Sequence, residues 1–101
     1  MAEVYTAAVW TVKDGHEEDF VRLWRELGTH TVEDFPNAGG TLLRDRERPN
    51  RFISFGAWES VEEVERWRAS SAFRDAVRQM EPVLAGFEPG TFDVELKMGR
   101  A

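Results

Sequence analysis

The amino-acid sequence predicts one small α+β domain over residues 1–101, in which four strands form an antiparallel sheet and the helices cover one face. Residues 4–12 and 51–58 are rich in β-branched and aromatic side chains, which favour strands. Residues 16–33 repeat apolar side chains every three or four positions, which is the spacing of one helix face. A chain of 101 residues is long enough for one domain with a modest core.

The first predicted strand, residues 4–12, is apolar on both of its sides. Side chains alternate along a strand, so odd and even positions face opposite ways. One side carries Val4, Thr6, Ala8, Trp10 and Val12, and the other carries Tyr5, Ala7, Val9 and Thr11. We therefore expect both faces of the sheet to be covered, one of them by helices.

The first predicted helix spans about residues 16–33. Three acidic residues at 17–19 suit the positive end of the helix dipole. Its apolar face consists of Phe20, Leu23, Trp24, Leu27 and Thr31. Pro36 and the glycines at 39–40 end the helix, because they cannot continue it.

Residues 41–44 and 51–58 are predicted to pair as antiparallel strands through the polar loop 45–50. Ser60 and Glu63 then have the spacing of a capping box, which predicts a helix that starts there and buries Val61, Val64 and Trp67.

Ser70 and Ser71 are predicted to interrupt this second helix. A further helical piece follows, with Phe73 and Met80 on one apolar stripe. The sequence then predicts a turn at Glu88-Pro89-Gly90 and a last strand over residues 91–98.

The resulting order is β-α-β-β-α-β. With right-handed crossovers, this order gives a ferredoxin-like fold with both helical regions on one face of a four-stranded antiparallel sheet. The opposite face would carry Tyr5, Val9, Ile53 and Phe55. A patch of this kind is large for a small protein, and pairing two copies face to face would cover it. We therefore predict a homodimer.

Composition and charge exclude several classes of function. The net charge is −6, which disfavours nucleic acid and anionic membranes as partners, because both are bound by clustered basic residues. No apolar run approaches the ~20 residues of a membrane span, and a cytoplasmic location is the expectation. The chain has no cysteine, and its two histidines, His16 and His30, would lie about 21 Å apart on one helix. We therefore expect neither a metal site nor a cofactor.

Three stretches of the chain resemble the antibiotic biosynthesis monooxygenase (ABM) domain of the dimeric α+β barrel superfamily. They are Trp10-Thr11-Val12-Lys13-Asp14-Gly15 before a helix with Phe20, Arg51-Phe52 leading through Phe55 to Trp58-Glu59-Ser60, and Trp67-Arg68-Ala69-Ser70-Ser71-Ala72-Phe73. The resemblance covers almost the whole chain. It implies a dimeric barrel in which each subunit holds a pocket between its sheet and its helices. Members of this family include oxygenases that use no metal or flavin on aromatic polyketides, haem-degrading enzymes and many proteins of unknown role.

The resemblance also implies candidate site residues. Trp58 stands where the polyketide-oxidising branch has a pocket tryptophan at the end of the third strand. Ser54 and Val64 stand where that branch has asparagine and tyrosine. The alternative is that Trp58 is a core ring that covers the strand end. Trp67 matches a tryptophan of the haem-degrading branch, but Val77 stands where that branch has its axial histidine.

These matches lead to two main functional hypotheses and a weaker third. The first is a cofactor-independent monooxygenase that holds a small, polyketide-like aromatic substrate between Trp24, Trp58, Trp67 and Phe73. His30 and Ser54 are its polar candidates, with Trp58 and His30 in catalytic roles. The alternative for His30, which its place near the end of the helix favours, is a partly exposed helix histidine without a catalytic role. The second hypothesis is a non-catalytic ligand-binding or accessory module, and the third is a haem-handling protein.

Overall fold

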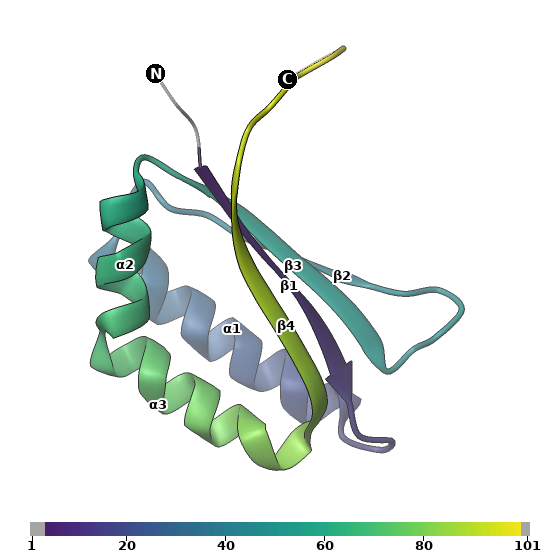
Figure 1. The fold of residues 1–101 in the computed structure, drawn as a ribbon. Coiled ribbons are helices and arrows are strands. Elements are labelled where there is room, and N and C mark those ends of the chain that lie inside the picture. The colour runs from purple at the N-terminus through teal and green to yellow at the C-terminus, as the bar shows by residue number, and fades with distance from the viewer. Residues whose placement is uncertain (1–3, 100–101) are drawn as a thin grey trace.

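The computed structural model describes residues 4–99, which form one sheet with three helices on a single face (Figure 1). The elements follow the predicted order, with the second helical region divided in two. They are β1 (Val4–Val12), α1 (Glu17–Asp34), β2 (Thr41–Arg44), β3 (Arg51–Trp58), α2 (Val61–Ala69), α3 (Ser71–Met80), the 3₁₀ turn η1 (Glu81–Val83) and β4 (Leu84–Asp93). The α+β, ferredoxin-like fold class is thus confirmed for a single chain.

The sheet has the strand order β2-β3-β1-β4, and all neighbouring strands run antiparallel. The long strand β1 lies in the middle, where it pairs with β3 on one side and β4 on the other. Buried and half-buried residues alternate along β1, so one face meets the helices. Because β1 is central, its inward side chains lie at the middle of the space under the helices.

The core lies between the inward face of the sheet and helices α1 and α3. Its largest fully buried side chains include Phe20 of α1, Phe52 of β3 and Met80 of α3. A smaller cluster at the other end joins Trp58 to Val64 of α2. Between residues 4 and 99, no helix has both the length and the apolar character needed to cross a membrane.

Helix α2 ends and α3 begins at Ser70, where the sequence predicted an interruption. The Ser70 hydroxyl donates to the carbonyl of Trp67 (2.6 Å) and accepts from the backbone N–H of Phe73 (3.2 Å). One side chain therefore closes α2 and caps α3. The predicted cap of α2 is also present, since the Ser60 hydroxyl accepts from the N–H of Glu63 at 3.1 Å.

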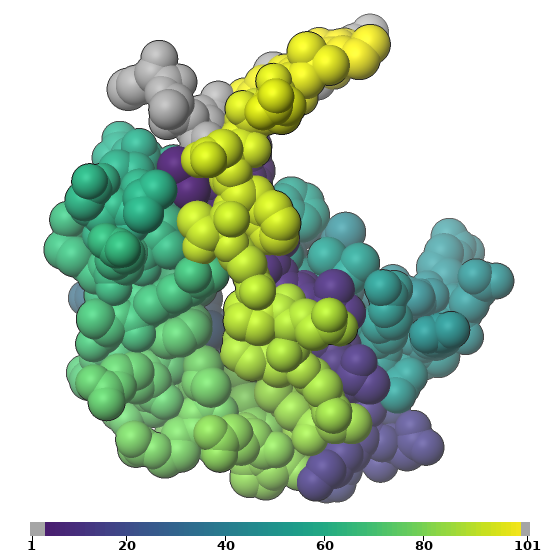
Figure 2. All heavy atoms as spheres, in the orientation of Figure 1, coloured from purple at the N-terminus to yellow at the C-terminus, as the bar shows by residue number. Residues whose placement is uncertain are grey.

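Three local predictions were wrong, namely the turn at 88–90, the bounds of the last strand and the burial of Val61. Residues 88–90 are not a turn but lie within β4, where Pro89 pairs with Ala8 of β1. β4 is an edge strand, and only such a strand accepts a residue without an N–H. The last strand accordingly ends at Asp93, and the segment 94–99 has no regular structure and projects from the body of the molecule (Figure 2).

Val61 is 43% exposed rather than buried, and it is the first residue of α2.

Candidate functional site

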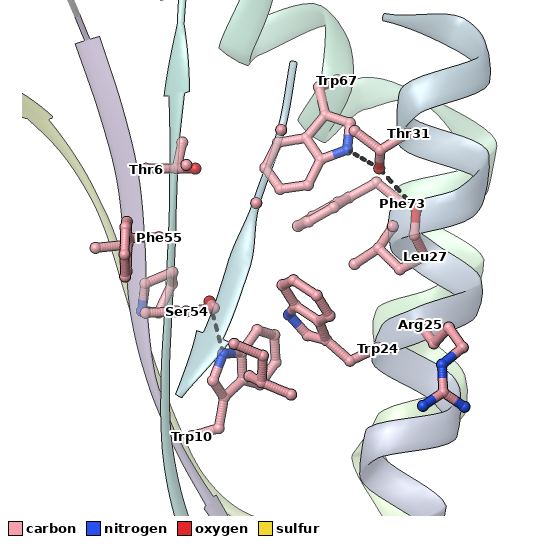
Figure 3. Close-up of a pocket in the computed structure, with 18 of the residues that line it drawn as sticks. Thr6, Trp10, Trp24, Arg25, Leu27, Thr31, Ser54, Phe55, Trp67 and Phe73 are labelled. Carbon is pink, nitrogen blue, oxygen red and sulfur yellow. Dashed lines mark hydrogen bonds between the residues drawn. The ribbon is translucent and has the colours of Figure 1, made fainter. Parts of the chain in front are cut away.

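A cavity of about 550 Å³ opens between the inward face of the sheet and helices α1, α2 and α3 (Figure 3). This volume lies within the range of sites that hold small organic molecules. All four tryptophans of the chain line it, together with Phe73, Phe87 and Ser54. The five predicted substrate-contacting residues therefore share one cavity, namely Trp24, Ser54, Trp58, Trp67 and Phe73.

The aromatic wall is built from rings on five different elements. Trp67 of α2 lies between Trp58 of β3 and Phe73 of α3, with ring centroids 4.8 and 4.5 Å away. At the other end, Trp10 of β1 stacks on Phe87 of β4 at 4.3 Å. Such ring pairs stabilise the packing by more than their buried area alone.

Hydroxyl groups hold three of the indoles in place. Trp10 donates to Ser54, Trp58 donates to Thr6 and Trp67 donates to Thr31, each at 2.9 Å between Nε1 and the hydroxyl oxygen. Thr31 in turn donates to the carbonyl of Leu27 at 2.7 Å (Figure 3). Sequence reasoning missed Thr6 and Thr31, because a helix or strand threonine carries no local mark of the indole it will meet.

Trp58 belongs to both the core and the cavity. Its side chain is only 5% exposed, it packs against Phe35, and it also lines the cavity. It therefore forms a wall rather than projecting into the space. Val64, at the position where the resemblance expects tyrosine, is fully buried beside Trp58 and does not line the cavity.

His30 does not reach the cavity. It lies on the opposite side of Leu27, in a shallow groove between α1 and α3, and its side chain is 62% exposed. Its Nδ1 atom is 3.5 Å from a carboxylate oxygen of Glu33. The structure therefore separates His30 from the other predicted site residues.

Arg68 is a cavity residue that sequence reasoning overlooked. It leaves α2 toward β4, where its guanidinium donates to the Thr91 hydroxyl (2.7 Å) and to the Gly90 carbonyl (3.1 Å). Within residues 4–99 it has no ion pair with a carboxylate. Partial burial lowers the pKa of Arg68 below its ordinary value.

The chemical character of the cavity is aromatic, with few ionisable groups. Among the described residues that line it, Arg25 and Arg68 are the charged ones, and none carries a carboxylate or an imidazole. Arg25 points away from the sheet (Figure 3). Within residues 4–99, no group of three or more histidine, aspartate and glutamate side chains could hold a metal ion. The site can therefore enclose a flat apolar molecule and offer it hydrogen-bond donors.

Solved structures share this fold over nearly their whole length. A variant of SnoaB from Streptomyces nogalater, described as a cofactor-independent oxygenase, superposes with a TM-score of 0.86 at 20% identity, covering 97% of this chain and 98% of SnoaB. Two further proteins, named as candidate antibiotic biosynthesis monooxygenases, come from Nitrosomonas europaea and Caulobacter crescentus. The Nitrosomonas protein has a TM-score of 0.83 at 14% identity, and the match covers 96% of this chain and 94% of that protein. The Caulobacter protein has a TM-score of 0.82 at 15% identity, and the match covers 96% of this chain and 92% of that protein.

The sequence itself carries the family assignment. No curated protein matches the chain at a significant level. The family model for antibiotic biosynthesis monooxygenase, however, matches residues 4–79, which run from β1 almost to the end of α3 and contribute most of the cavity wall. The chain therefore belongs to the antibiotic biosynthesis monooxygenase family.

Proposed function

We propose that this protein is a cofactor-independent monooxygenase that oxidises a small, planar, electron-rich aromatic compound. The observation that carries the proposal is the 550 Å³ cavity with its aromatic wall, set between sheet and helices in a member of this family. The fold likeness to SnoaB, itself a cofactor-independent oxygenase, supports it further.

The chemistry requires a substrate that itself supplies all the electrons that reduce O₂, such as an anthrone, whose acidic CH₂ lies in a ring that also holds a carbonyl. Loss of a proton gives a carbanion, which passes one electron to O₂, and the resulting radical pair joins as a peroxide. The peroxide takes up a proton and loses water, so that CH₂ and O₂ become C=O and H₂O. An enclosed site that excludes water and places donors at the developing oxyanion would favour this sequence.

In the described part of the chain, the cavity has no carboxylate or imidazole to act as base. The substrate must therefore be acidic enough to lose its proton to water. We assign Trp24, Trp58, Trp67 and Phe73 to the binding of its rings, and Ser54 and Arg68 to its oxygen atoms. His30 has no assigned role, because it lies outside the cavity.

Oxygen uptake with anthrone or a dihydroxynaphthalene tests the proposal. Val32 lines the mouth of the cavity and is 46% exposed, whereas Val61 is 43% exposed on α2 and lies outside the cavity. Val32→Trp should lower kcat/KM at least tenfold by blocking entry, and Val61→Trp, the matched control, should leave it unchanged. Uptake no faster than in buffer for the unmodified protein would overturn the proposed reaction.

A second candidate is a binding module without turnover. Two observations favour it, namely the buried Val64 in place of a tyrosine and the absence of a base among the described lining residues. Tight binding of the same aromatic compounds without oxygen uptake would distinguish it from the oxygenase.

A further inference from the structure

The four tryptophans around the cavity differ in one respect. Three of them, Trp10, Trp58 and Trp67, already donate their indole N–H to a hydroxyl oxygen of the protein. Trp24 also lines the cavity, but its N–H makes no hydrogen bond to any residue between 4 and 99. Since the other three indoles are satisfied, Trp24 carries the indole donor that is available to a bound molecule.

The Trp24 ring lies close to two glycines. A Cβ atom at Gly40 would lie 3.4 Å from Cη2 of Trp24, and one at Gly28 would lie 3.9 Å from Cζ3. The six-membered ring of the indole therefore rests close to backbone that carries no side chain. Figure 3 shows the edge of Trp24 that carries Nε1 turned toward the sheet and into the cavity.

Ser54 adds a second donor on the opposite wall. Its oxygen accepts from Trp10, and its own hydroxyl proton has no acceptor within residues 4–99. Ser54 projects from β3 toward α1, and Trp24 projects from α1 toward the sheet (Figure 3). A flat ligand between these walls would therefore meet a polar N–H and O–H within an otherwise apolar enclosure.

A ligand that fills the cavity displaces the water that solvates the Trp24 N–H. If the ligand brings an oxygen acceptor, the hydrogen bond is replaced. If it does not, the donor is left buried and unpaired, which weakens binding by roughly tenfold or more. Sites built around a hydrogen-bond donor discriminate in this way against analogues that lack the acceptor.

We propose that the Trp24 indole N–H binds an acceptor oxygen, a ring carbonyl or phenolate, of the aromatic ligand. Trp24 thus selects keto or hydroxy polycycles over the plain hydrocarbons and fixes their orientation in the cavity. The inference rests on the proposed function for the aromatic nature of the ligand, and it does not require turnover.

The test compares 9-fluorenone with fluorene, which has the same skeleton without the carbonyl. Titration of the ¹⁵N-labelled protein should move the Trp24 indole N–H resonance, identified by its loss in Trp24→Phe, with fluorenone and not with fluorene. Fluorenone should bind roughly tenfold tighter than fluorene. Trp24→Phe should bring the two affinities together.

Trp67→Phe is the matched control, because the Trp67 N–H is held by Thr31 and should not meet the ligand. This variant should keep the preference for the ketone even if both affinities fall. The retained indole resonances of each variant show that it is folded. A preference that survives in Trp24→Phe, a shift confined to another indole, or a failure of both compounds to bind would overturn the inference. A preference for the ketone without oxygen uptake would support the role of Trp24 and would contradict only the proposed reaction.

Discussion

Single hydroxyl groups decide how the tryptophans of the cavity are held. Thr31 shows this most clearly, since its hydroxyl group accepts from the Trp67 indole N–H and donates to the Leu27 carbonyl. An indole on α2 is thereby tied to the backbone of α1. The position of the aromatic wall thus depends on contacts between elements that are distant in sequence.

Thr31→Val keeps the shape of the side chain and removes the acceptor for Trp67. The Trp67 N–H would be left partly buried and unpaired, so we expect the free energy of unfolding to fall by about 1–3 kcal/mol. Urea denaturation measures the change. Thr29→Val is the matched control, because Thr29 also bonds back along α1 but holds no indole. Equal losses in the two variants would contradict the role given to Thr31.

The residues of the site illustrate what a sequence can predict. The alternation of side chains in β3 and the helical spacing of apolar residues in α1 were enough to place Ser54, Trp58 and Trp24 on faces that oppose one another. His30 was misplaced because Leu27, three residues before it, borders both the cavity and the groove between α1 and α3, so a position next to Leu27 need not reach the cavity. Arg68 was missed because its partners, Gly90 and Thr91, lie more than twenty residues further along the chain.

At the scale of elements, strong local sequence patterns predicted the bounds of helices and strands correctly, and weak patterns did not. β2 and β3 begin and end where their sequence patterns predicted, and the Ser60 cap starts α2. The predicted turn at 88–90 failed because its Pro-Gly chemistry was overridden by pairing of β4 with the central strand β1. Only the place of β4 at the sheet edge, which is a tertiary property, explains that outcome.

Ser70→Ala tests how the α2–α3 junction supports the site. The change removes the hydroxyl that bonds both Trp67 and Phe73, so we expect a loss of about 1 kcal/mol in unfolding free energy and weaker ligand binding. Ser71→Ala is the control, because Ser71 is exposed in the first turn of α3. If Ser71→Ala proved the more damaging change in thermal unfolding, the junction would not depend on Ser70.

The β2–β3 hairpin should respond to pH through Asp45. Hydrogen bonds from the backbone N–H groups of Glu47 and Arg48, and then Arg51, hold the pKa of Asp45 below its ordinary value of 3.8. The carboxylate therefore stabilises the folded state above the unfolded pKa, and this contribution is lost as pH falls through the lower folded pKa.

We accordingly expect Asp45→Ala to lower the free energy of unfolding at pH 7. The difference in this free energy from the unmodified protein should shrink as the solution is acidified below about pH 4. Denaturant unfolding at several pH values measures the difference. Glu47→Ala removes a carboxylate from the same loop while the backbone bond to Asp45 remains. A penalty for Asp45→Ala that is constant with pH would show that the charge is not responsible.

At the scale of the whole molecule, the face of the sheet turned away from the helices carries partly exposed apolar side chains. Leu43, Phe55 and Phe92 on this outer face are 48%, 39% and 55% exposed. They are spread across the sheet, since Leu43 is opposite Ile53, Phe55 is opposite Ala7 and Phe92 is opposite Tyr5. An apolar surface spread over a complete sheet is typical of a face that contacts another molecule.

We predict that two copies of the chain pair through this outer face in a two-fold dimer. Phe55→Glu would place charges against each other at such an interface, so the dissociation constant should rise at least a hundredfold, which is roughly 2.7 kcal/mol. Val61→Glu adds the same charge on α2, away from the outer face, and should leave the dimer intact. Sedimentation at micromolar concentration measures both. Because the cavity opens on the helical side of the sheet, a monomeric protein would refute the pairing without removing the aromatic site.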